Sequence, residues 1–317
     1  MFALRGVVVS SSVFAMVYCL LSVAVMLAWR RIQVHALRLP VGRAANWLFR
    51  LRLLPLTGAA AVTSAFTVPS FLLLEPRSIY EPVHPGLVVF AIGGVGLGIY
   101  GLVNAAWALW RASRAISAWS LGAKPFRAAN SLPALRISQA VPAMAAAGIL
   151  YPRVLVSRAA ERALSESELK AALNHEMAHL RRRDNLKKLL LHTVRFPGMR
   201  GLEAAWLEAI EMAADDAAVS NPAEALDLAA ALIKLSRLTA ADAAALDLTA
   251  AIVAGPMAIV RARIERLMDW NDARREAQGS SRLLWAYGAT VALMAGLTIT
   301  YSHVLTRVHA ATEWLVR

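Results

Sequence analysis

Four apolar stretches interrupt the polar pattern of the chain, and each is long enough to cross the apolar core of a bilayer, which takes about 20 helical residues. They cover residues 6–28, 51–74, 87–110 and 283–305. The first ends at Trp29-Arg30-Arg31 without a small-residue cleavage site, which is typical of an uncleaved span rather than a signal peptide. Four such stretches in one chain indicate a polytopic membrane protein rather than a set of buried core helices.

Between the third and fourth stretches the apolar runs are shorter and more polar. Residues 135–156 predict a short β-hairpin, and residues 168–191 predict one helix, because no Gly or Pro interrupts them and Ser165 or Ser167 can cap the start. A second, Ala-rich helix begins near Gly201. The chain is therefore predicted to be mainly α with a small β-hairpin. Its predicted parts are a three-span region (1–129), a cytosolic domain (130–275), and a fourth transmembrane helix with a short extracytoplasmic tail (276–317).

Composition and charge agree with this division. Hydrophobic residues make up 58% of the 317 residues, and the mean hydropathy is +0.50, too apolar for an ordinary soluble domain of this length. Basic residues favour the cytosolic side of a membrane. They are concentrated before the second span and after the third, at Arg30, Arg31, Arg38, Arg43, Arg50 and Arg52, and at Arg111, Arg114, Lys124 and Arg127. This distribution predicts an extracytoplasmic N-terminus and places residues 111–282 in the cytosol.

The net charge of +13 indicates a membrane partner rather than a nucleic acid. Basic segments beside a span are attracted to anionic lipid headgroups. We expect no direct nucleic-acid binding, because the sequence contains no aromatic-interleaved basic patch and no recognition-helix pattern.

The candidate chemistry begins at His175-Glu176-Met177-Ala178-His179, which has the H-E-x-x-H pattern of zinc hydrolases. On a helix the two histidines lie one turn apart on the same face, so both can reach one metal ion. Glu176 then points beside that ion toward the water it binds. The alternative is a surface helix that carries two solvated histidines.

Zinc in a hydrolase needs a third protein ligand and an open position for water. The second helix offers Glu211 and Asp215, which are also four residues apart. One of them can bind the metal while the other meets the far nitrogen of a ligand imidazole. The residues alone leave open which carboxylate takes which role. As stabilisers of a reaction intermediate, the cytosolic segment offers His192, Arg195 and Arg263, with Tyr151 as its only tyrosine.

The order of these motifs resembles that of the BlaR/MecR antirepressor family of bacterial membrane zinc peptidases. The matching runs are residues 164–169, 174–179, 182–184 and 211–215, with short strands in 136–156 and a later helix at 263–267. The resemblance implies a gluzincin-like peptidase domain facing the cytoplasm, with zinc on His175, His179 and Glu211. It further implies Glu176 as general base and Asp215 as the partner of a ligand imidazole. Ste24/HtpX-type membrane proteases share the spacing of both metal motifs.

The functional prediction is an integral-membrane zinc endopeptidase in the cytoplasmic membrane that performs regulatory proteolysis. Only about a dozen residues follow the fourth span, so antibiotic sensing is not predicted. Family precedent suggests a winged-helix repressor as substrate, or self-cleavage in the polar segment 271–281. Two alternatives remain open: a catalytically silent signalling or scaffold protein, and a quality-control protease of the Ste24/HtpX kind. The oligomeric state stays unknown.

Overall fold

The computed structural model describes most of the chain, namely residues 2–76, 84–126, 134–138, 142–149, 151–193, 196–243, 257–270, 301, 303–312 and 314. Most of the predicted fourth span (283–305) and the whole segment 271–281 lie outside the described residues. Among the residues described, three helical stretches are long and apolar enough to cross a membrane: Phe2–Leu37, Val41–Leu74 and Pro85–Ser120. They contain the first three predicted spans.

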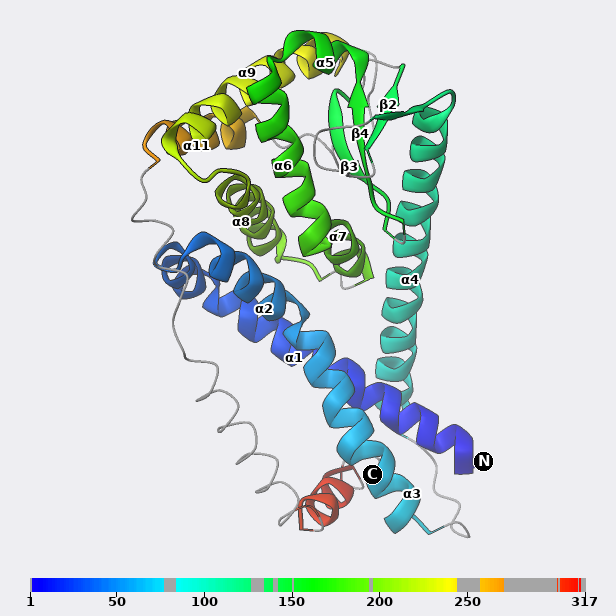
Figure 1. The fold of residues 1–317 in the computed structure, drawn as a ribbon. Helices are drawn as coiled ribbons and strands as arrows, with labels where there is room; N and C mark the ends of the chain where they lie inside the picture. The colour runs from blue at the N-terminus through cyan, green and yellow to red at the C-terminus, as the bar shows by residue number, and fades with distance from the viewer. Residues whose placement is uncertain are drawn as a thin grey trace.

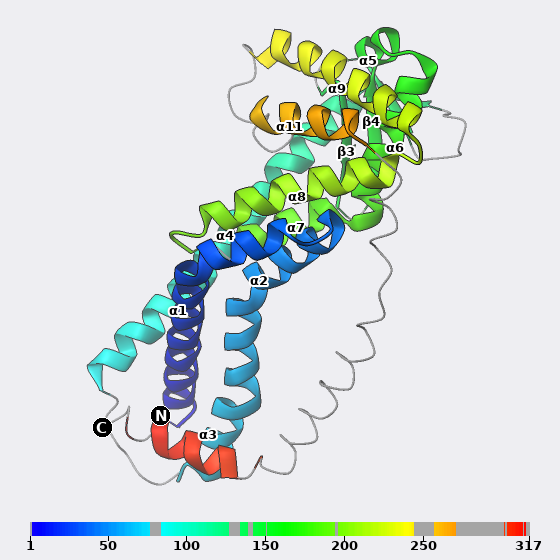
Figure 2. The ribbon, with the colours of Figure 1, turned by 90° about the vertical axis from the view of Figure 1, so that its left-hand side faces the viewer.

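The first two of these helices continue well past their apolar stretches. Helix α1 (Phe2–Leu37) runs about two and a half turns beyond residue 28, and α2 (Val41–Val62) begins just four residues after α1 ends. A π-helical turn (Thr63–Thr67) then leads into α3 (Val68–Leu74). We call residues 29–52, the end of α1 and the start of α2, the basic hairpin. It lies beneath α8 (Arg200–Ala218), as Figures 1 and 2 show.

A four-stranded mixed sheet lies between α4 (Pro85–Ser120) and α6 (Glu166–Arg182), as Figure 1 shows. Its strands are β1 (Lys124–Phe126), β2 (Ala134–Ile137), β3 (Met144–Ala147) and β4 (Arg153–Ser157), in the order β1-β2-β4-β3. One face of the sheet packs on α4 through Leu155, and the other packs on α6 (Glu166–Arg182) through Val154 and Val156.

The sheet corrects the predicted hairpin over residues 135–156. Strands β3 and β4 do form an antiparallel pair, but β2 pairs with β4 in parallel. The physical reason is the composition of β4, whose Val154, Leu155 and Val156 are all at most 1% exposed. A strand that is apolar on both faces takes a central position in a sheet. It therefore has β2 on one side and leaves β3 at the edge.

The predicted helix over residues 168–191 is two helices, which is a second correction. Helix α6 begins with a capping box formed by Ser165 and Glu168 and ends at Arg182. Arg183 then adopts a left-handed conformation, with φ 53° and ψ 41°, and α7 (Asp184–Thr193) follows in a new direction. No Gly or Pro marks this break, so the sequence pattern did not reveal it. The change of direction turns the buried Asp184 back toward α6.

The remaining helices complete the domain around α6. Short α5 (Arg158–Ala163) precedes α6, and α9 (Pro222–Ala243) and α11 (Met257–Met268) follow α8. Helices α9 and α11 share a core with the end of α8. The other side of α8 packs on the basic hairpin, where Leu48 of α2 and Trp206 of α8 are at most 2% exposed. Helix α8 thus lies between α9 and α11 on one side and the basic hairpin on the other.

Candidate metal centre

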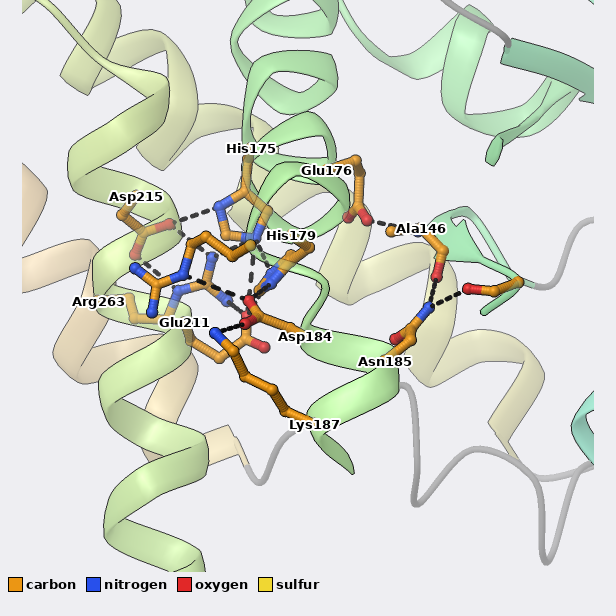
Figure 3. Close-up of polar contacts among 12 residues, drawn as sticks. Ala146, His175, Glu176, His179, Asp184, Asn185, Lys187, Glu211, Asp215 and Arg263 are labelled. Carbon is orange, nitrogen blue, oxygen red and sulfur yellow. Dashed lines mark hydrogen bonds and ion pairs between the residues drawn. The ribbon is translucent and has the colours of Figure 1, made fainter. Parts of the chain in front are cut away.

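Helix α6 presents the two predicted histidine ligands on one buried face. His175 and His179 are 5% and 9% exposed. Their Nε2 atoms lie 3.1 Å apart, and the rings are almost perpendicular, at 86° (Figure 3). The helical spacing explains this geometry, since residues four apart stack one turn above each other. Both nitrogens point to the same space beside the helix.

The third predicted ligand reaches this space from α8. Oε2 of Glu211 lies 3.6 Å from the Nε2 atom of each histidine. The donor atoms of these three residues all fall within 4.8 Å of one another. For zinc bonds of 2.0–2.1 Å in a tetrahedron, neighbouring donor atoms are about 3.3 Å apart. The observed separations are close to that value, so two neutral imidazoles and one carboxylate fit a single zinc-like ion.

A carboxylate holds the far nitrogen of each histidine (Figure 3). Nδ1 of His175 lies 2.9 Å from Oδ1 of Asp215, and Nδ1 of His179 lies 2.9 Å from Oδ2 of Asp184. Both carboxylates are at most 1% exposed. Such a partner places the proton on Nδ1 and leaves Nε2 free to bind a metal. The family resemblance implies this contact for Asp215. For Asp184 the sequence left two roles open, support of the helix that carries the histidines and a solvated acid, and the structure places it at His179.

These contacts shift the pKa values of the cluster. Burial lowers the pKa of His179, but hydrogen bonds to Asp184 and Glu211 outweigh it and raise the pKa to about 9. Burial raises the pKa of Asp215, yet Arg263 and His175 together bring it down to about 2. Glu211 likewise has a pKa well below its usual range, because the two histidines outweigh the effect of burial. The carboxylates therefore remain ionised at neutral pH.

Arg263 of α11 closes the cluster from the side of α8. Its guanidinium donates to both oxygens of Asp215 at 2.7 and 2.8 Å, and Nη1 lies 3.1 Å from Oε2 of Glu211. It is 6% exposed, and Nη2 lies 3.3 Å from Nε2 of His175. From the sequence, Arg263 was expected only as one of three possible stabilisers of a reaction intermediate. The structure places it at the ligands and shows that it orients Asp215.

Two of the other possible stabilisers lie in the described part of the chain. His192 lies in the last turn of α7, and Tyr151 is 80% exposed between β3 and β4. Arg195 lies outside the described residues.

Glu176 faces the edge of the sheet rather than the protein interior. Its Oε2 accepts a hydrogen bond of 2.5 Å from the backbone N–H of Ala146 in β3. The side chain of Asn185, at the start of α7, donates to the carbonyl oxygens of Ala146 at 2.9 Å and of Gly148 at 3.2 Å (Figure 3). Alternate residues of a strand direct their N–H and C=O groups to the same side. Ala146 therefore offers both groups to the outer edge, next to the metal-ligand cluster.

Asn185 is a site residue that sequence analysis missed. It lies in a polar run after the motif, and only the turn at Arg183 brings its amide to β3.

The donor set suits a divalent metal ion, and three helices of the described chain are long and apolar enough to cross a membrane. The sequence profile of peptidase family M48 matches residues 127–314, more than half of the chain, and the chain belongs to that family. No curated protein and no solved structure matches the chain. The protein is therefore a membrane-bound metallopeptidase, and peptidases of this family are typically zinc-dependent. The finer resemblance to the BlaR/MecR antirepressors stays a prediction.

Proposed function

We propose that the protein is an integral-membrane zinc endopeptidase that cleaves cytosolic or membrane-proximal proteins. The observation that carries the proposal is the convergence of His175, His179 and Glu211 on one space, with Glu176 between that space and the outer edge of β3. In this proposal the three ligands hold zinc, and Asp184 and Asp215 fix the imidazole tautomers. When bound, zinc makes hydroxide available at neutral pH and polarises the scissile carbonyl.

The chain's own residues then carry the proton. Glu176 accepts a proton from the attacking water and passes it to the leaving amine. A general acid–base group of this kind contributes typically 10²–10⁴-fold to the rate. In the structure its carboxylate is bonded to Ala146, so that bond must break, or be shared, when substrate enters.

The edge of β3 supports recognition of an extended peptide. A substrate strand can add to an exposed sheet edge through backbone hydrogen bonds. Here the outward N–H and C=O of Ala146 are already bonded to Glu176 and Asn185, two polar side chains that a peptide backbone could replace. An endopeptidase needs such a side-on mode, because its substrate continues in both directions.

The proposed setting is the bacterial cytoplasmic membrane, with the N-terminus outside and the zinc site in the cytoplasm. The basic residues before the second span and after the third support this orientation. Regulatory proteolysis is the proposed role, directed at a winged-helix repressor or at the protein's own segment 271–281. The motif resemblance to the antirepressors supports it. The domain boundaries 130–275 belong to the same proposal.

The experiment compares wild type with Glu176→Gln in nanodiscs, with zinc content and cleavage of fluorogenic casein as readouts. We expect Glu176→Gln to retain zinc and to lose cleavage by at least about a hundredfold. Glu166→Gln is the matched control, because Glu166 is an exposed glutamate in the first turn of the same helix. Normal cleavage by zinc-loaded Glu176→Gln would overturn the mechanism, and a wild type that binds zinc without cleaving would favour the scaffold alternative.

A second measurement separates the proposed roles. New protein N-termini are catalogued in cells that express wild type or Glu176→Gln. A few cleaved proteins, or fragments of the protein itself that end within 271–281, support regulatory proteolysis. Broad cleavage of misfolded membrane proteins supports the quality-control alternative.

A further inference from the structure

The basic hairpin has two faces with opposite surroundings. Its inner face belongs to the core that holds α8, where Ala36 of α1 and Ala45 and Leu48 of α2 are at most 9% exposed. Trp206 of α8 packs into the same core and is 1% exposed. The inner face of the hairpin thus packs against α8, the helix that carries Glu211.

The outer face continues the apolar surface of the first membrane span. Leu20, Val23, Leu27 and Val34 follow one another at spacings of three, four and seven residues, so they share one side of α1. They are 68%, 38%, 77% and 52% exposed. Leu37, which is 81% exposed, adds to this surface at the end of the helix. Exposed apolar side chains therefore extend beyond the point where the apolar stretch of the sequence ends.

Arginines accompany this apolar surface. Five exposed arginines lie on the hairpin, at Arg30, Arg31, Arg38, Arg43 and Arg50. The whole segment 29–52 contains neither Asp nor Glu. The sixth arginine, Arg52, is fully buried and pairs with Glu203 of α8 at 2.8 Å. The outer face is consequently positive as well as apolar, which is the composition of helices that lie in the plane of a membrane surface.

The direction of the hairpin fits such a position. Figure 2 shows that α1 turns away from the direction of its first half, so that the hairpin lies across the end of the membrane helices with the peptidase domain above it. The side opposite α8 then faces the bilayer that α1 has just left. In water, the exposed apolar side chains of Val34 and Leu37 would stay hydrated, which costs free energy. Contact with lipid acyl chains removes that cost.

We propose that the outer face of the basic hairpin is seated on the anionic lipid headgroups of the leaflet from which α1 emerges. Leu27, Val34 and Leu37 reach the boundary of the acyl chains, and the arginines contact headgroup phosphates. Because α8 rests on the opposite face, this contact fixes the height of the metal centre above the bilayer. The proposal concerns the outer face of the basic hairpin and does not depend on peptidase activity.

The test uses the full chain in nanodiscs, with Cys19→Ser as the background because Cys19 is the single cysteine. A spin label is attached at Leu37→Cys, and its collision rates with oxygen and with a water-soluble nickel chelate are measured. Leu226→Cys in α9 is the matched control, since Leu226 is also an exposed leucine, at 56%, and α9 lies on the far side of the peptidase domain (Figure 1). Discs of phosphatidylcholine alone are compared with discs that also contain phosphatidylglycerol.

In the anionic discs we expect the label at position 37 to be accessible mainly to oxygen and the label at 226 mainly to nickel. Each basic residue near an anionic surface changes the equilibrium of the hairpin face between the lipid surface and water about fivefold. Replacing Arg30, Arg31 and Arg38 by Gln should therefore shift it about a hundredfold toward water and raise the nickel collision rate at position 37. If this variant does not fold, the protein with native arginines still tests the proposal. The nickel collision rate at position 37 should then be lower in the discs that contain phosphatidylglycerol than in the discs of phosphatidylcholine alone.

Two results would overturn the proposal. Equal nickel access at positions 37 and 226 in anionic discs would place the hairpin face in water. Protection of position 37 from both reagents would show that protein covers the face, either a second copy or a partner.

Discussion

Replacing Asp184 by Asn tests whether the turn between α6 and α7 contributes to metal binding. Asp184 is fully buried and lies 2.9 Å from Nδ1 of His179, while Lys187 donates to its other oxygen at 3.1 Å. Asparagine keeps the size of the side chain but removes the charge that makes the imidazole basic. Loss of such a partner typically weakens metal binding 10–100-fold, which corresponds to about 1.4–2.8 kcal/mol.

The size of the effect depends on pH in a way that the structure predicts. In the metal-free protein the pKa of His179 is raised to about 9, so at pH 7 a proton competes with zinc and weakens its apparent binding. Asp184→Asn lowers that pKa and relieves part of the competition. The variant should therefore lose little apparent affinity near pH 7 and show the full loss above about pH 9.

The assay is chelator competition for zinc at both pH values, with purified protein in nanodiscs. Asp216→Asn is the matched control, because Asp216 is a neighbouring carboxylate that pairs with Arg266 at 2.6 Å rather than with a ligand. If the two variants bind zinc equally well above pH 9, Asp184 does not support the metal centre and the reasoning fails.

Three further predictions concern stability, measured by thermal unfolding in detergent. In chelator-treated protein, the raised pKa of His179 stabilises the fold fully below about pH 6.5, and this stabilisation should disappear as the pH rises to about 9. An unfolding temperature that does not change with pH over that interval would contradict this prediction. Arg183→Gly should stabilise the protein by about 0.5–1 kcal/mol, because glycine adopts the left-handed conformation without the penalty that other residues incur. Arg183→Val should destabilise it. A valine variant more stable than the glycine variant would exclude strain at this turn. Glu203→Gln should destabilise the protein by about 3–5 kcal/mol, because it removes the carboxylate that pairs with the fully buried Arg52. Arg52→Met should cost less, because Glu203 is partly exposed and can be hydrated. Equal losses of stability in the two variants would argue against this pair.

Local patterns in the sequence determined the ligand pair and the membrane helices. His175 and His179 face one ion because helical periodicity places residues four apart on one side. The start of α6 was also local, since Ser165 and Glu168 satisfy each other's backbone N–H groups. The three helices that could span a membrane follow from length and hydropathy alone. Each of these features depends on interactions within one segment, so the segment's own residues specify it.

Tertiary structure decided the features that depend on partners far apart in the chain. Arg183 leaves the helical conformation without a glycine, and the turn brings Asp184 to His179 and Asn185 to β3. Arg263 reaches Asp215 across 48 residues, and the basic hairpin meets α8 across about 150. No local pattern encodes such contacts, because their free energy comes from burying apolar surface and pairing charges between segments that only the complete fold brings together.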